Sequence, residues 1–385
     1  MRAGRFASVP DADWNDWRWQ MRHAIRNLKA LEEHVALTED ERRGCVDTAS
    51  IFRMGITPYY LSLMDPERAD CPVRMQAIPR AAEAVVRPGE LADPLGEDKT
   101  RPVTALVHKY PDRVLLLATD SCSVYCRHCT RRRITKGGEA ELSRSELTKA
   151  LGYIKAHPEV RDVLISGGDP LMLSDERLDE LLGAVRAIPH VEMIRIGTRN
   201  PVCLPMRVTA ALAQVLRKHA PLYVVTHFNH PKEVTVEARE ACERLVDCGV
   251  PVENQVVLMR GVNSSARIIT ELSHACLRMR VRPYYLHQMD VAEGCEHLRT
   301  PLAEGVRIIE QMRGHTTGMA VPHFAVDLPG GGGKVTLQPE YVIERGPTST
   351  SLRNYRNERF EYPEPTLSDC TCTYDEVWLK TASGR

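Results

Sequence analysis

The sequence has no long hydrophobic run and no net charge, and both absences narrow the range of functions. Its richest apolar runs, such as Val114–Ala118, match one strand and fall far short of the roughly 20 residues that cross a bilayer. The residues up to Asp16 contain no apolar core of a signal peptide. With 51 basic and 51 acidic side chains, the chain offers no bulk positive charge to nucleic acid. We therefore expect a cytoplasmic protein that binds neither membrane nor nucleic acid.

Internal repeats, low-complexity segments and a G-x-G-x-x-G turn after the first predicted strand are also absent. The missing glycine motif removes the best evidence for a dinucleotide-binding, doubly wound sheet. The 385 residues leave room for one large domain with extensions, or for two domains. A hydrophobic content of 43% and a charged content of 26% are typical of a soluble globular enzyme.

From residue 114 onward, short β-type runs alternate with amphipathic helical runs. The predicted strands cover 114–119, 162–166, 193–197, 222–226, 252–258, 282–287 and 323–326, and the predicted helices cover 144–156, 175–187, 209–219, 232–248, 266–278 and 301–313. This alternation predicts parallel strands with crossover helices. We expect an α/β fold, a partial (β/α)6 TIM-like barrel with its chemistry at the carboxyl ends of the strands. An open doubly wound sheet is the alternative architecture.

The pattern also suggests three regions. Residues 1–100 form a predicted helical N-terminal region, with a helical stripe over 13–31, a capping-box start at Thr38 and a loop or linker over 87–100. Residues 101–340 form the predicted barrel. Residues 341–385 lose the rhythm and form a predicted C-terminal extension with a possible role in subunit contact.

Twelve cysteines in a reducing compartment favour thiols or metal ligands over disulfides. Cys122, Cys126 and Cys129 form C-x3-C-x2-C just past the first predicted barrel strand. Three thiolates at this spacing suit a four-iron cluster that leaves one iron open to another ligand. A structural zinc loop is the alternative, but zinc prefers four ligands in paired C-x2-C units, so we favour the cluster.

The cysteine spacing is the signature of the radical S-adenosylmethionine (SAM) superfamily, and the chain resembles the lysine 2,3-aminomutase family. The resemblance runs from about residue 13 to 345 and rests on WNDWRWQMRHAIRN, DSCSVYCRHCTRRR, SGGDPL, THFNHP, NQVVLMRGVN, RVRPYY and VDLPGGGGK, in that order. It implies an isomerase with a [4Fe-4S] cluster, SAM and pyridoxal 5'-phosphate (PLP). It also implies a reductant such as flavodoxin or ferredoxin, and a homodimer or homotetramer.

The resemblance assigns the cofactor-binding residues. It implies that the three cysteines hold the cluster and that Lys334, which ends the run PGGGGK, binds PLP covalently. Without the resemblance this run is typical of a flexible glycine linker, since the P-loop pattern is not met. The positions that match the family's SAM and PLP-phosphate sites are, for SAM, Gly167, Gly168, Asp169, His227 and Gln255, and, for the phosphate, Arg113 and Lys109.

The substrate residues follow from the same resemblance. Arg131 matches the arginine that binds the substrate carboxylate, and Asp290 and Asp327 match the aspartates that bind the distal ammonium of lysine. Related glutamate enzymes have neutral or basic residues at these two positions, because carboxylates would repel glutamate. The expected reaction is L-lysine to β-lysine. L-Arginine is the alternative, since a guanidinium also pairs with two carboxylates and His287 stands where a tyrosine is usual.

Three further hypotheses remain open. The substrate could be a lysine on a protein, although the C-terminal extension favours a free amino acid, or the chain could be an iron–sulfur protein without turnover. Some family members carry a C-terminal zinc site. Here only Cys370 and Cys372 remain, with Asp375 at the third position and Ser265 at the partner position, so loss of that zinc is expected.

Overall fold

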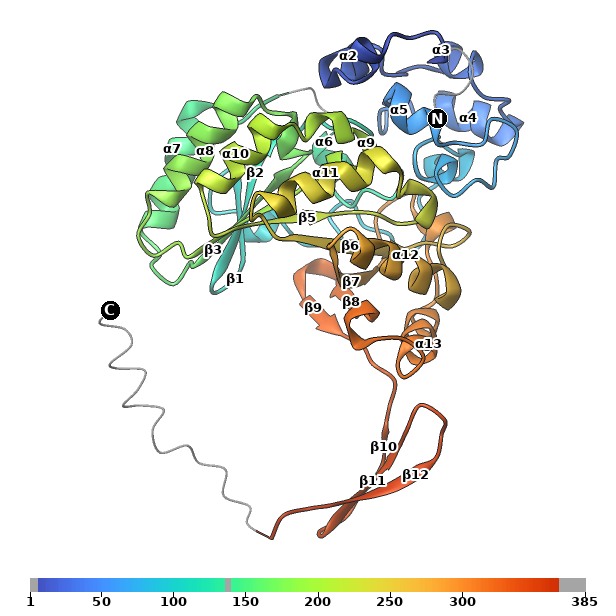
Figure 1. Cartoon of the computed structure of the whole chain (residues 1–385), viewed down its shortest axis with the longest axis vertical. Coiled ribbons are helices and arrows are strands. Elements are labelled where there is room, and N and C mark those ends of the chain that lie inside the picture. The colour runs from blue at the N-terminus through green and yellow to red at the C-terminus, as the bar shows by residue number, and fades with distance from the viewer. Residues whose placement is uncertain (1–5, 136–139, 367–385) are drawn as a thin grey trace. The chain divides into compact units, whose positions relative to one another are not determined.

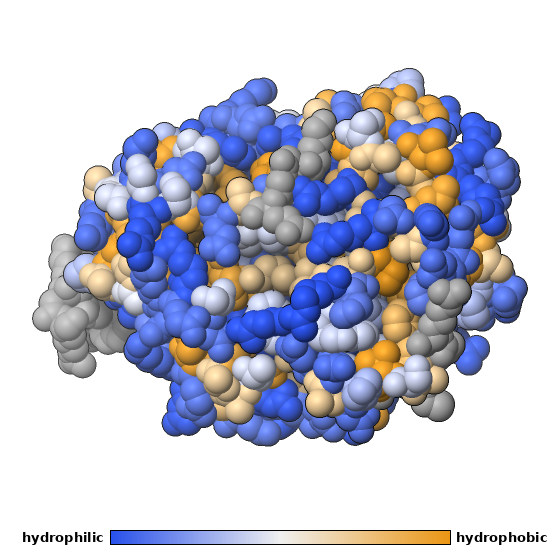
Figure 2. All heavy atoms as spheres, turned by 90° about the horizontal axis from the view of Figure 1, so that it is seen from above, coloured by the Kyte–Doolittle hydropathy of each residue, from blue (hydrophilic) through white to orange (hydrophobic). Residues whose placement is uncertain are grey.

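The computed structural model describes residues 6–135 and 140–366. By the density of their internal contacts, the residues form two units, Met1–Gln338 and Pro339–Arg385, and each is described by itself. The described parts contain no helix that is long and apolar enough to cross a membrane. In the view of Figure 2, hydrophilic residues cover most of the visible face, and hydrophobic residues form smaller groups between them.

A single sheet with strand order β1 to β9 forms the centre of the first unit (Figure 1). Its strands are β1 (Leu106–Tyr110), β2 (Arg113–Thr119), β3 (Asp162–Gly167), β4 (Met193–Gly197), β5 (Leu222–Thr226), β6 (Val252–Leu258), β7 (Arg282–Gln288), β8 (His323–Leu328) and β9 (Gly333–Thr336). Strands β2 to β8 run parallel, whereas β1 and β9 are antiparallel edges. Each parallel strand follows its neighbour in sequence, so the predicted partial (β/α)6 barrel is confirmed and the doubly wound alternative is not.

Crossover helices cover the sheet (Figure 1). They are α7 (Arg144–Lys155), α8 (Asp175–Arg186), α10 (Ala210–Lys218), α11 (Val236–Asp247), α12 (Ala266–Arg278) and α13 (Leu302–Met312), with the shorter α6 (Arg132–Thr135) and α9 (Asn200–Cys203) in the loops. Helix α8 shows why they form: its buried residues, Leu178, Leu181, Leu182 and Val185, follow the spacing of one helical face. These side chains pack on the buried residues of the strands, and the apolar core lies between sheet and helices.

The N-terminal region contains α1 (Asp11–Trp14), α2 (Trp17–Arg22), α3 (Leu28–Glu32), α4 (Glu39–Asp47) and α5 (Pro58–Ser62). The capping box predicted at Thr38 starts α4. The single helical stripe predicted over 13–31 is wrong. Asp16 and Asn27 each cap the start of a new helix, and Ile25 between them pairs with Ile56 in an isolated β-bridge.

The two edges of the sheet meet at one point. The hydroxyl of Tyr110 on β1 accepts a hydrogen bond of 2.8 Å from the backbone N–H of Lys334 on β9. Sequence periodicity missed both edge strands, which are short and antiparallel. This hydrogen bond joins the last strand of the sheet to the first, so the glycine run that precedes Lys334 lies near β1.

The second unit contains an antiparallel sheet of β10 (Val342–Arg345), β11 (Ser349–Arg353) and β12 (Arg359–Pro363). Most of its side chains are exposed, which explains why no hydrophobic alternation marked these strands in the sequence.

Candidate active site

The three motif cysteines lie on the loop that directly follows β2, at the carboxyl end of a parallel strand. All three are free and half-buried. Burial raises the pKa of Cys122 well above its ordinary range and that of Cys129 to about 11, and their neighbouring thiols raise both further. In the described ranges no three His, Cys, Asp or Glu side chains are placed around one metal ion. A four-iron cluster distributes its thiolate ligands over separate irons, and three neighbouring thiols on one loop fit it.

Arg199, which follows β4, contacts this loop through its guanidinium. One Nη donates to Cys126 Sγ at 2.7 Å. The other donates to Glu233 at 2.8 Å, to Gln76 at 2.5 Å and to the hydroxyl of Tyr60 at 3.0 Å. These partners are buried and come from both the N-terminal region and the barrel, so the helical region completes the site. A guanidinium donor beside Cys126 suits a sulfur that serves as a ligand of a cluster.

The glycine pair after β3 allows a close approach to the same loop. A Cβ on Gly167 would lie 2.3 Å from the carbonyl oxygen of Thr119, and one on Gly168 would lie 2.3 Å from that of Ser121. Gly167 also has a φ of +119°, which disfavours any other residue. The N–H groups of Gly168 and Asp169 donate to those carbonyls at 2.6 and 2.7 Å. The glycines therefore hold the end of β3 against the start of the cysteine loop.

The carboxylate of Asp169 binds hydrogen-bond donors of the protein itself. This buried carboxylate accepts hydrogen bonds from the N–H groups of Leu171, Arg199 and Asn200 and from the hydroxyl of Thr198. Burial raises its pKa, although these four donors act in the opposite direction. Asp169 thus fixes the turn that aims Arg199, and its expected pairing with an ammonium of SAM stays a prediction.

His227 and Gln255, the other predicted SAM residues, lie on the next two strands of the sheet. His227 follows β5, Gln255 lies within β6, and both are half-buried. Burial lowers the pKa of His227 to about 4, with the cations of Arg199 and Arg131 contributing. The imidazole is therefore neutral at physiological pH and retains one nitrogen as a hydrogen-bond acceptor.

The glycine run makes a hairpin that places Lys334 opposite Asp327. Positive φ values at Gly330, Gly331 and Gly333 turn the chain from β8 to β9, and Asp327 and Lys334 become register partners. Lys334 Nζ lies 2.5 Å from Asp327 Oδ2. The isolated glycine-linker interpretation is therefore wrong for this structure, because the run is an ordered turn that fixes a lysine.

Further titratable groups face this lysine. His287 Nδ1 on β7 lies 3.2 Å from Lys334 Nζ. Burial raises the pKa of Asp290, just after β7, to about 6, and the Asp327 carboxylate raises it further, against opposing contributions from Lys334 and Arg131. The structure therefore brings the two predicted aspartates, the predicted lysine and the predicted arginine within electrostatic reach of one another.

Arg131 has a partner that the sequence did not suggest. Its Nε and Nη2 bind Glu97 Oε1 at 2.9 and 2.7 Å. Burial lowers the pKa of Arg131, but the Glu97 carboxylate together with Cys129 and Asp290 raises it overall. The linker expected over 87–100 is instead packed against the site. Besides Glu97, it supplies the carbonyl oxygen of Pro94, which accepts from the N–H of Gly330 at 3.0 Å.

Lys109 and Arg113 flank Tyr110 at the β1–β2 hairpin. Lys109 Nζ donates to the carbonyl oxygen of Leu95 at 3.3 Å, and Arg113 binds Asp112 at 2.9 Å with its guanidinium 3.9 Å from the centre of the Tyr110 ring. Because Tyr110 also binds the backbone of Lys334, both cations stand beside the lysine turn.

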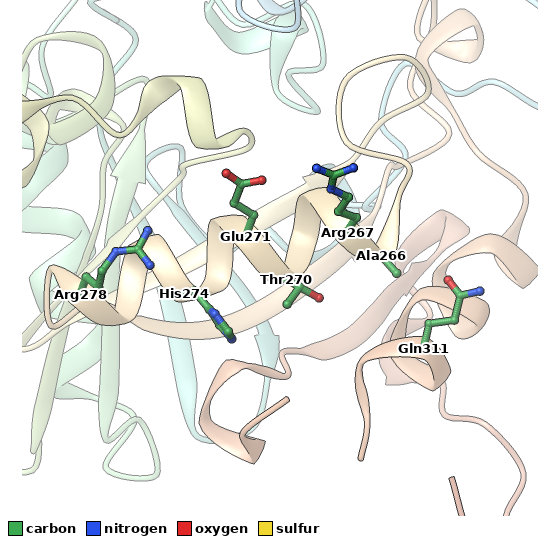
Figure 3. A pocket seen from close by; sticks show the side chains of 7 residues that line it. All are labelled: Ala266, Arg267, Thr270, Glu271, His274, Arg278 and Gln311. Carbon is green, nitrogen blue, oxygen red and sulfur yellow. The ribbon is translucent and has the colours of Figure 1, made fainter. Parts of the chain in front are cut away.

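A surface hollow of about 490 Å³ lies elsewhere, along helix α12. In Figure 3 its side chains, among them Glu271, Thr270 and His274, spread along the helix and do not converge on one point. None of its lining residues belongs to the predicted site.

Comparison with known proteins decides the family. The radical SAM superfamily model matches residues 116–270, and the lysine-2,3-aminomutase model matches residues 309–383. The chain is 50% identical to L-lysine 2,3-aminomutase of Fusobacterium nucleatum over 96% of its own length and 87% of that protein. It is 49% identical to the L-lysine 2,3-aminomutase of Clostridium subterminale, over 95% and 89% of the two chains. The chain belongs to the lysine 2,3-aminomutase family. It is 39% identical to the glutamate 2,3-aminomutase of Clostridioides difficile, over 90% and 82%.

As a member of the lysine 2,3-aminomutase family, the chain is a radical SAM isomerase that uses a [4Fe-4S] cluster, SAM and PLP, as its resemblance predicted. The structure suits them. Three neighbouring thiols suit a cluster. A half-buried lysine held at a glycine turn, with Lys109 and Arg113 beside it, suits an aldehyde cofactor that carries a phosphate.

The C-terminal zinc prediction falls partly outside the described residues. Cys370, Cys372 and Asp375 all lie there. Ser265, the matching partner position, precedes α12 as its N-cap residue.

Sequence reasoning missed three residues of the site. Arg199, Glu97 and Tyr110 act through partners that are distant in the chain, so no local spacing marks them. Arg199 did leave one signal, a charged residue at the carboxyl end of a predicted barrel strand.

Proposed function

We propose that the chain moves the α-amino group of a free cationic L-amino acid to Cβ, and that its substrate is L-lysine, which becomes β-lysine. The observation that carries the proposal is the pair of carboxylates, Asp290 and Asp327, beside Lys334. Two carboxylates attract the distal ammonium of lysine and repel the side chain of glutamate. The relatives with about half of their residues identical are named for L-lysine, which supports the same substrate.

The proposed roles of the remaining residues follow the chemistry of their side chains. When bound, the cofactors supply the radical that removes hydrogen from Cβ and the carbonyl that carries the migrating nitrogen. Lys334 is proposed to bind PLP covalently, with Lys109 and Arg113 toward its phosphate. Arg131 is proposed to bind the substrate carboxylate, because its planar guanidinium presents two parallel N–H donors.

The contact between Lys334 and Asp327 implies an order of events, because two ammonium groups would compete for one carboxylate. A free Lys334 ammonium and the distal ammonium of a substrate compete for the same carboxylate, since Nζ already lies 2.5 Å from Asp327 Oδ2. While Lys334 was bonded to PLP, before a substrate amine displaced it, its nitrogen would no longer be a free ammonium that competes for Asp327. Asp327 can then bind the substrate, while Asp290 supplies the second charge.

The same two carboxylates keep L-arginine as the alternative substrate, because a guanidinium can bind both through separate N–H groups. A guanidinium presents N–H groups on two sides, and the two carboxylates come from different segments, Asp290 just after β7 and Asp327 within β8.

A direct assay separates the candidates. The chain is reconstituted anaerobically with iron, sulfide and PLP, then incubated with SAM, dithionite and separate samples of L-lysine, L-arginine and L-glutamate. Chromatography resolves α- from β-amino products, and Lys334→Ala is the matched inactive control. Formation of β-lysine supports the proposal, and formation of β-arginine alone replaces it with the alternative. Turnover of glutamate, or of none of the three amino acids, contradicts the proposed cationic substrate.

The biological setting is also proposed. A flavodoxin or ferredoxin is the expected electron donor, because a radical SAM cluster must be reduced before each cleavage of SAM. A homodimer or homotetramer and a cytoplasmic location remain expectations from the sequence.

A further inference from the structure

His287 makes the closest contact between a neutral base and the predicted cofactor lysine. Its Nδ1 lies 3.2 Å from Lys334 Nζ. Its position is fixed by the sheet, because β7 pairs in parallel with both β6 and β8 around it. In the tautomer with its proton on Nε2, the Nδ1 lone pair at this distance accepts a hydrogen bond from an ammonium and is in position to accept its proton.

The surroundings of His287 keep it neutral while Lys334 is charged. Burial lowers its pKa well below the ordinary value, and the cations of Lys334 and, when protonated, His227 lower it further. The other titratable groups that face it are Asp327 on β8, 4.0 Å from Nδ1, and Tyr285 on its own strand, with ring centres 5.2 Å apart. One of the three causes disappears when Lys334 loses its proton, so the ring becomes a better base as the transfer proceeds.

Lysine forms a bond to an aldehyde only as a neutral amine, because an ammonium has no lone pair. We propose, on the basis of the function proposed above, that His287 is the base that takes the proton from Lys334 when this lysine bonds to PLP. The Nζ–H bond breaks, Nδ1 gains the proton, and the Nζ lone pair forms the bond to the aldehyde carbon. The aldehyde oxygen leaves as water with the two hydrogens that remain on the amine. No oxidant or reductant is needed.

Asp327 is the competing acceptor, since its Oδ2 lies 2.5 Å from the same nitrogen. Burial lowers the pKa of His287 well below its ordinary value, so the choice between the two acceptors rests on charge and not on ordinary basicity. Proton transfer to Asp327 would remove the charge that the proposed substrate site requires. With His287 as the acceptor, the resulting imidazolium faces an ionised Asp327 at 4.0 Å, which stabilises it.

The test measures covalent attachment itself. PLP is added to the full chain after removal of bound PLP, samples are quenched with borohydride at intervals, and the adduct on the Lys334 peptide is quantified by mass spectrometry. His287→Ala is expected to attach PLP about 100-fold more slowly, in the range of general-base contributions. Added imidazole is expected to restore the rate in proportion to its concentration. His274→Ala is the matched control, because that histidine on α12 binds Thr316 outside the site.

His287→Gln provides the second variant, because glutamine can accept a hydrogen bond but cannot take a proton at neutral pH. It is expected to be as slow as alanine. A rate within about threefold of the wild type in either variant overturns the proposal, and so does a slow alanine variant that imidazole fails to accelerate. In contrast, a wild-type adduct on another lysine contradicts the proposed function at Lys334, whatever the histidine variants do.

Discussion

Replacing Asp290 with asparagine is expected to stabilise the ligand-free protein while it weakens substrate binding. Burial, with the Asp327 carboxylate, raises the pKa of Asp290 to about 6 from an ordinary value of 3.8. At about 1.4 kcal/mol per pKa unit, this difference corresponds to about 3 kcal/mol. The folded state binds the proton more tightly than the unfolded state, so stability falls as the pH rises from about 4 to about 6. Above that window the folded protein carries the whole penalty.

Asp290→Asn removes this penalty because its amide does not ionise. Urea unfolding at pH 7.5 should therefore show a gain of up to about 3 kcal/mol, and at pH 3.5 almost none. Asp247→Asn is the control, since its partner Arg280 and the aspartate itself are both exposed. The control should change stability by less than about 1 kcal/mol. An Asp290→Asn protein that is no more stable than the wild type at neutral pH refutes the reasoning.

The same variant should lose affinity for its cationic substrate. A hydrogen bond to a charged group contributes about 1.5–3 kcal/mol, so KM for lysine should rise by about ten- to a hundredfold. The substrate-binding carboxylate must be ionised, so in the wild type 1/KM should fall as the pH drops below about 6. An unchanged substrate preference in the variant would count against Asp290 as a substrate ligand.

Other predictions concern the cofactors and the packing of the loop. Cys126→Ala should reduce the iron content from about four per chain to nearly none, and a variant that keeps a stable cluster and cleaves SAM contradicts the cluster assignment. Lys334→Ala should yield no borohydride-trapped PLP adduct at this position in peptide maps, whereas the wild type should. Gly168→Ala should lower the unfolding free energy by about 1–3 kcal/mol, because its Cβ would lie 2.3 Å from the Ser121 carbonyl oxygen. Gly152→Ala, whose Cβ meets nothing within 4 Å, should be neutral or stabilising in the same urea-unfolding measurement.

The barrel could be predicted because its strands carry buried apolar residues, in a near-continuous run in β2 and at alternate positions in β4 and β6. The predicted bounds of β4, β5 and β6 and of helix α12 match the structure residue for residue. The edge strands β1 and β9 could not be found this way, since only the first two residues of β1 and none of β9 are buried, and both strands contain polar or glycine residues. The helical stripe over 13–31 failed for another reason: two capping residues inside it restart the helix.

The sequence suggested the candidate site in two ways. The spacing of three cysteines within one loop indicates a cluster site by itself, whereas Lys334 was assigned only by the family resemblance, because its glycine run alone is typical of a linker. The partners that set their states lie far away in the chain: Glu97 precedes Arg131 by 34 residues, and Glu233 follows Arg199 by the same number. Such pairs depend on the order of the strands around the barrel, which brings together residues that no local pattern relates.

This arrangement assigns opposite charges to the two ends of the proposed substrate. Arg199 and Arg131 present cations near the cysteine loop, whereas Asp290 and Asp327 present carboxylates around Lys334. The net charge of zero in the whole sequence conceals this separation. Each of these charged groups either has a partner of opposite charge or has a shifted pKa, because the desolvation free energy of an isolated ion inside the protein is large. Burial raises the pKa of Asp290, so its ionised form is disfavoured in the ligand-free protein, and a cation bound beside it would offset that cost. Selectivity for a cationic substrate therefore follows from the same imbalance that makes the site a weak point of the folded protein.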